Sequence, residues 1–184
     1  MALEATFREL SVNLHHLYDA LDALHMTVGD KPEHDGAAVA DDLADRSMEM
    51  MGTLHEARKA AINARRAVGH PIDLDRARRA LAVCQERFQR IERQFSGGLA
   101  AYEKLQELGR IGGERRGEWQ AWSASTRQGI EECRGPLEQT SNALAACWQD
   151  LAERLGTVNF SVQTVGQQIG VPGSEIAELA HEKT

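Results

Sequence analysis

Histidine and carboxylate residues gather near the N-terminus of this 184-residue chain and are its first candidates for chemistry. His15 and Asp19 are one helical turn apart, and Asp22 precedes His25 by three residues, so each pair can share a helix face. Imidazole and carboxylate groups are common metal ligands. A di-iron helical bundle needs Glu-x-x-His on each of two helices, and the helices predicted below contain no such motif. We therefore expect these side chains, with His16, to flank a leucine seam, without metal or cofactor.

Nucleophilic chemistry has even less support in the sequence. Cys84, Cys133 and Cys147 are odd in number and lack metal-finger spacing. The chain has no Gly-x-Ser-x-Gly, P-loop or dinucleotide-binding glycine motif. We expect reduced, buried thiols in a cytoplasmic protein, no catalytic residue and no enzymatic activity.

Charge is distributed unevenly around a net value of −7. Residues 1–57 carry net −9, residues 58–93 net +6 and residues 94–184 net −4. The basic block surrounds a predicted helical hairpin, which makes it a candidate anion-binding surface. A solvated face, or pairing with acidic residues of the N-terminal helix, is the alternative. The candidate anion-binding residues are Arg58, Lys59, Arg65, Arg66, Arg76, Arg78 and Arg79.

Aromatic and leucine residues flank Gly112–Gly113 and form the candidate partner-binding surface. Tryptophan is favoured at the centres of protein interfaces. Ordinary core at the end of a bundle is the alternative role for these residues. The candidate partner-binding residues are Tyr102, Leu105, Leu108, Trp119 and Trp122.

The elements that must position these residues are long amphipathic helices. In the N-terminal segment, leucine or phenylalanine recurs in alternating steps of four and three, which is a heptad seam. Similar seams follow in three later segments, separated by glycine and proline. The first seam consists of Leu3, Phe7, Leu10, Leu14, Leu17, Leu21 and Leu24. The predicted helices cover about 3–27, 37–68, 72–110 and 114–156.

Three details of the pattern each allow two interpretations. Gly97–Gly98 predicts either a kink or a close helix contact. Pro136 predicts a kink or a short break in the fourth helix. Residues 157–170 stay in heptad phase but also alternate like a strand, and we favour a helical extension to about residue 170.

Short connections between long helices predict antiparallel neighbours. The expected fold is all-α, an elongated up-down-up-down four-helix bundle or coiled coil, with one domain over 1–170 and a tail over 171–184. Because the first helix is short, we expect the third and fourth helices to project beyond it near Gly112–Gly113. No apolar run approaches the ~20 residues that span a bilayer.

These patterns favour a non-enzymatic scaffold or adaptor that acts through protein–protein interaction or self-assembly. Two alternatives stay open. One is nucleic-acid or polyanion binding through the basic hairpin, and the other is a metal-dependent bundle enzyme that uses the N-terminal histidines.

Overall fold

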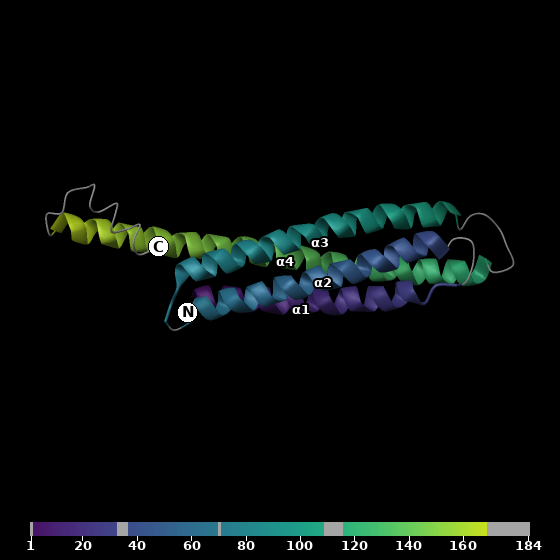
Figure 1. The fold of residues 1–184 in the computed structure, drawn as a ribbon, viewed down its shortest axis with the longest axis horizontal. Helices are drawn as coiled ribbons and strands as arrows, with labels where there is room; N and C mark the ends of the chain where they lie inside the picture. The colour runs from purple at the N-terminus through teal and green to yellow at the C-terminus, as the bar shows by residue number, and fades with distance from the viewer. Residues whose placement is uncertain (1, 33–36, 70, 109–115, 169–184) are drawn as a thin grey trace.

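The computed structural model describes residues 2–32, 37–69, 71–108 and 116–168, which form four helices. They are α1 (Ala2–Gly29), α2 (Ala37–Ala67), α3 (Leu74–Leu108) and α4 (Arg116–Gln168). Figure 1 shows them side by side in an elongated bundle, and no strand occurs among the described residues. The predicted all-α four-helix bundle is confirmed.

The heptad seams form the core of the bundle. All seven residues of the N-terminal seam are buried, and five of them have no exposed surface. The α2 seam narrows from Leu54 to Ala57, Ala61 and Ala64, all fully buried, and these small residues let neighbouring helices approach closely. Burial of these stripes removes apolar surface from water, which is the main force that holds such a bundle together.

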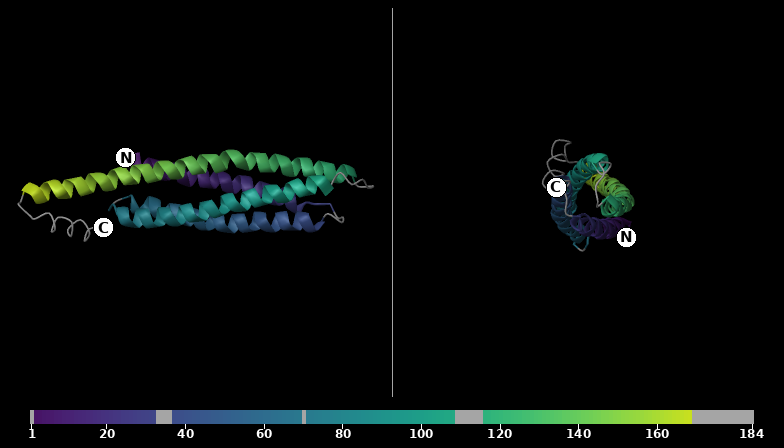
Figure 2. Two further views of the ribbon diagram at one scale, coloured as in Figure 1. Left: turned by 90° about the horizontal axis from the view of Figure 1, so that it is seen from above. Right: turned by 90° about the vertical axis from the view of Figure 1, so that its right-hand side faces the viewer.

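Contacts between helices fix an antiparallel order. Along α2 and α3, Glu56 pairs with Arg87 at 2.9 Å, whereas the earlier Glu49 accepts a hydrogen bond from the later Gln94 at 2.9 Å. The packing of α1 on α2, α2 on α3, and α1 on α4 is extensive, and that of α3 on α4 is the least so. The end-on view in Figure 2 shows the four helices around a common axis. The up-down-up-down arrangement follows from this order.

Two glycines mark the places where helices approach most closely. A Cβ atom added at Gly129 of α4 would lie 3.1 Å from Leu24 Cδ1 of α1. A Cβ atom at Gly98 of α3 would lie 3.4 Å from Leu43 Cδ1 of α2. Because α3 is unbroken here, Gly97–Gly98 is a site of close packing rather than a kink.

One helix boundary differs from the sequence prediction for a clear reason, and the structure decides between the two ends predicted for the fourth helix. Asp73 caps α3, since its Oδ1 accepts a hydrogen bond from the backbone N–H of Arg76 at 2.8 Å, so α3 begins at Leu74 rather than at residue 72. Helix α4 does not end at Gly156 but continues to Gln168. The predicted helical extension is therefore confirmed to that residue.

Of the kink or short break predicted at Pro136, the break does not occur, because α4 is one continuous helix through this residue. The residue before a proline disfavours helical geometry partly because its Cβ meets the proline ring. Here that residue is Gly135, which has no Cβ, so this part of the clash is absent. Figure 2 shows α4 as a curved but unbroken rod.

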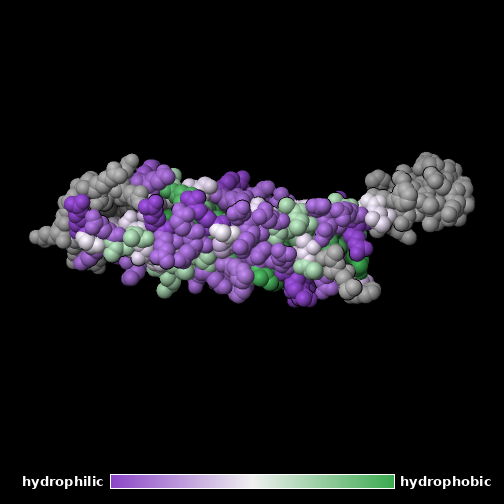
Figure 3. Space-filling model, turned by 180° about the vertical axis from the view of Figure 1, so that it is seen from behind, coloured by the Kyte–Doolittle hydropathy of each residue, from purple (hydrophilic) through white to green (hydrophobic). Residues whose placement is uncertain are grey.

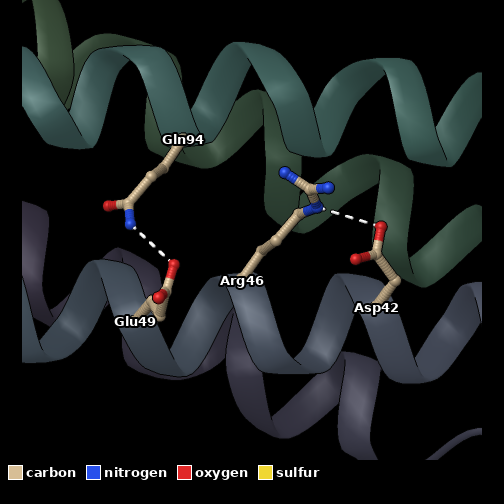
Figure 4. A network of polar contacts seen from close by, with 4 residues as sticks. All are labelled: Asp42, Arg46, Glu49 and Gln94. Carbon is tan, nitrogen blue, oxygen red and sulfur yellow. Dashed lines mark hydrogen bonds and ion pairs between the residues drawn. The ribbon is translucent and has the colours of Figure 1, made fainter.

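Polar residues cover the outside of the bundle, and the face in Figure 3 is predominantly hydrophilic. Figure 4 shows part of the α2–α3 flank, where Arg46 Nε donates to Asp42 Oδ2 at 2.9 Å. This hydrogen bond raises the pKa of Arg46 above its ordinary value. The Arg46 guanidinium also lies over Gly97, where an added Cβ would be 3.1 Å from Nη1. The flank therefore combines intrahelical and interhelical polar contacts.

Candidate interaction surfaces

The N-terminal histidines are separated by the packing of α1. His15 and His16 are exposed, and His15 Nε2 lies 3.8 Å from Asp19. His25 is half-buried and its Nδ1 is 2.7 Å from the hydroxyl of the buried Ser47 on α2. Within the described residues, no group of three or more His, Cys, Asp or Glu side chains could hold a metal ion. The sequence has one Glu-x-x-His spacing, Glu178–His181, outside the described residues.

The three cysteines lie in the core, as their seam positions predict. Cys84, Cys133 and Cys147 have no exposed surface. Burial raises the pKa of each thiol to about 12. A thiolate is the nucleophilic form of cysteine, so these three residues, which are protonated at neutral pH, are weak nucleophiles there.

Tyr102 and Trp122 turn inward, so the expectation that they form an uncovered patch is wrong. Each is only 6% exposed. Trp122 Nε1 donates to the carbonyl of Thr27 at 3.1 Å, and Tyr102 Oη donates to the carbonyl of Ser123 at 2.8 Å. Helix α1 reaches this end of the bundle and covers it, which the comparison of helix lengths did not reveal.

Of the other three partner-binding candidates, the structure describes the side chain of Trp119 only. Trp119 is half-buried and packs edge-on against Trp122, with ring centroids 5.4 Å apart. Leu105 and Leu108 belong to α3, but their side chains are outside the described set. The reversal at Gly112–Gly113 also lies outside the described residues, as does the tail 171–184.

The basic hairpin residues do share one end of the bundle, but several are already paired. Arg58 lies over the ring of Tyr18 on α1 at 5.0 Å, and Arg78 and Arg79 pair with Asp75 within their own helix. The remaining candidates are exposed and make no ion pair with any described residue. These are Lys59, Arg65, Arg66 and Arg76.

The part of the bundle that projects beyond the neighbouring helices lies at the opposite end from the one predicted near Gly112–Gly113. Near the start of α1, Thr6 Oγ1 donates to Asp150 Oδ2 of α4 at 2.5 Å. Because the two helices are antiparallel, Ala2, four residues before Thr6, lies level with about residue 154 of α4. Helix α4 therefore runs past the beginning of α1, and Figures 1 and 2 show its C-terminal part extending beyond the other three helices.

The C-terminal part of α4 also extends along the bundle axis past the beginning of α3. Phe95 of α3 and Leu137 of α4 line the same shallow groove of about 360 Å³. Since α3 starts 21 residues before Phe95 at Leu74, its start is level with about residue 158 of α4. Residues 158–168, which we call the projecting end, thus run past both neighbours for about 16 Å at 1.5 Å per residue.

The signal that could have located this end is present in the sequence. Val158, Val162 and Val165 continue the heptad phase of Leu151 and Leu155. The projection was expected near Gly112–Gly113 because the first helix is short, and that comparison of lengths did not include the favoured extension of the fourth helix to about residue 170. The true projection follows once α4 is allowed to continue through Gly156.

No protein-family model matches this chain, and no curated protein or solved structure shows significant similarity to it. None of the helices, as far as they are described, is long and apolar enough to cross a membrane. Function must therefore be inferred from the surfaces of this chain itself.

Proposed function

We propose that the protein is a non-enzymatic helical scaffold that acts through protein–protein interaction at the projecting end of α4. The observation that carries the proposal is that α4 continues to Gln168 although α1 begins level with about residue 154. A helix whose seam residues recur every seven positions gains stability when a second helix covers the seam. Among the described helices, α1 and α3 lie beside α4 only up to about residue 158.

The chemistry of the rest of the molecule agrees with a scaffold role. The three cysteine thiols lie in the core, where burial raises their pKa to about 12. Its described histidines are divided between exposed positions and a hydrogen bond to Ser47. The groove beside Phe95 is shallow, whereas small-molecule sites usually enclose most of their ligand.

The test is affinity purification of the full chain under native conditions, with Val162→Glu as the disrupting variant. The matched control is Gln163→Glu, which adds the same charge one residue farther along the helix. We expect wild type and Gln163→Glu to retain a protein partner, which can be a second copy of the chain, and Val162→Glu to lose it. Recovery of no partner, or of the same partners with all three proteins, contradicts the proposal.

A second candidate function is polyanion binding at the hairpin end. It is favoured by the four exposed cations that lack an ion-pair partner among the described residues, Lys59, Arg65, Arg66 and Arg76. Polyanion binding weakens steeply as salt rises. Double substitution of Arg65 and Arg66 by Gln should therefore lower the salt concentration that elutes the protein from heparin. The same double change at Arg116 and Arg127, on the far part of α4, is the control, and equal elution shifts would rule out a hairpin site.

A further inference from the structure

The projecting end of α4, which runs past the other described helices, carries no charged residue in a chain that is otherwise rich in charge. Charged residues make up 27% of the sequence, yet Leu155–Ser174 contains none. No other uncharged stretch of the chain reaches this length. In coiled coils, charges that flank the seam select the partner and repel wrong pairings. A segment without such charges meets no like-charge repulsion from an identical segment.

We infer that two copies of the chain pair antiparallel through their projecting α4 ends. The inference rests on the proposed function and names the partner as a second copy. Apolar residue types continue along this end at Val158, Val162 and Val165, in phase with the buried Leu151. Two such segments supply each other with the same heptad pattern that α1 and α4 share inside the bundle.

The shape of the molecule favours the antiparallel direction. The four-helix part is much wider than the single helix that extends from it (Figures 1 and 2). A parallel pair would force the two wide parts against each other, whereas an antiparallel pair places them at opposite ends. This arrangement has two-fold symmetry, so the same patch is used on both copies.

The size of the overlap sets the expected strength. Residues 158–168 overlap over about 16 Å, which buries less surface than the ~1,200 Å² of a standard stable interface. The dimer is therefore weak and concentration-dependent. Because α4 is about 80 Å long, two copies that overlap by about 16 Å span about 140 Å, whereas a side-by-side dimer would span about 80 Å.

The decisive experiment measures mass and length of the full chain across a concentration series. Sedimentation equilibrium should show a monomer–dimer equilibrium, and small-angle X-ray scattering should show a maximum dimension near 140 Å for the dimer. Val162→Glu should weaken dimerisation at least about tenfold, because it buries a charge in the seam, and Gln163→Glu should not. Both variants should keep the unfolding transition of the wild-type bundle.

A pair of complementary variants tests the direction. In an antiparallel pair centred between residues 163 and 164, position 162 of one copy lies opposite position 165 of the other. A mixture of Val162→Glu with Val165→Lys should therefore dimerise more tightly than either variant alone. Recovery with Val162→Glu plus Val162→Lys instead would indicate a parallel pair and overturn the inference.

The remaining outcomes separate the inference from the proposed function. A strict monomer that still loses a different captured protein on Val162→Glu overturns the self-pairing and leaves the scaffold proposal standing. A dimer that is insensitive to Val162→Glu, or near 80 Å long, overturns the self-pairing as described. A strict monomer that captures no protein overturns both.

Discussion

Two parts of α4 share one periodicity and differ in what lies beside them. Up to Leu151, seam residues such as Leu144 and Cys147 are buried against α1 and α3. Leu155 is only partly buried, and beyond about residue 158 no described helix lies alongside. The difference is set by where the neighbouring helices begin rather than by the sequence of α4. A heptad pattern indicates that a helix needs cover, but it does not say which chain provides the cover.

The largest expected contrast between the two parts is in thiol reactivity. Burial raises the pKa of Cys147 from 9.0 to about 12, so at pH 8 its thiolate population is roughly a thousandfold smaller than that of an unshifted thiol. Gly156→Cys, at an exposed position with nothing within 4 Å, should react with a maleimide or disulfide reagent within minutes. The native thiols should react only slowly unless the protein is unfolded. Fast labelling of all three cysteines in the folded wild type would contradict the buried core.

The same pKa shift predicts a loss of stability in alkali. Because the folded-state pKa is about 12 and the ordinary value is 9.0, the unfolded chain loses its thiol protons first as pH rises. The unfolded state binds fewer protons between these values, so the free energy of unfolding should fall from about pH 9 toward pH 12. Cys84→Ala, Cys133→Ala and Cys147→Ala combined should make this alkaline decline shallower. Unfolding by urea at a series of pH values measures it.

Leucine truncation should show the next largest difference. Leu151 has no exposed surface, so Leu151→Ala should lower the free energy of unfolding by about 2–5 kcal/mol through lost burial and a residual cavity. Leu155 is four residues farther and partly exposed, and Leu155→Ala should cost about half as much or less. Urea denaturation followed by circular dichroism provides both values. Equal losses would mean that the cover of α4 does not end where the structure places it.

A glycine pair gives a smaller contrast within the same helix. Gly129→Leu forces a side chain against Leu24 and should destabilise the bundle by about 1–3 kcal/mol. Gly156→Leu enters open space and should be neutral or stabilising, because leucine is a better helix former than glycine. Thermal unfolding at low protein concentration compares the two. A neutral Gly129→Leu would show that α1 and α4 can separate at this contact without loss.

The smallest expected effect concerns the closed end of α4. Trp122→Phe keeps most of the buried ring but removes the hydrogen bond to the Thr27 carbonyl, which should cost about 1 kcal/mol. Trp148→Phe is the control, because Trp148 Nε1 is buried without a hydrogen-bond partner among the described residues. That variant should lose less. If the two variants lose the same stability, the Trp122 contact does not close this end.

The sequence predicted the helices and their seams well, because long heptad patterns depend on local residue spacing alone. The burial of every seam residue of α1 illustrates this. The sequence predicted poorly which helices project at each end of the bundle. The bundle was expected to project near Gly112–Gly113, yet α4 projects at its C-terminal end, and Trp122 was expected to be open there, yet α1 covers it. Both errors concern how far one helix extends relative to another, and that offset depends on contacts between distant residues.

The pairing of α1 with α4 has a consequence for the order of folding. The hydrogen bond from Thr6 to Asp150 joins residues 144 positions apart, whereas Gln94 and Glu49 in the α2–α3 hairpin are 45 apart. Closing the longer loop costs more chain entropy, so the hairpin should form first. During synthesis, the leucine seam of α1 then stays without its α4 partner until nearly the whole chain has been made. In pulsed hydrogen exchange during refolding, the amides of α2 and α3 should become protected before those of α1. The apolar seam of α1 that is exposed in that interval is where a chaperone would bind or aggregation would begin.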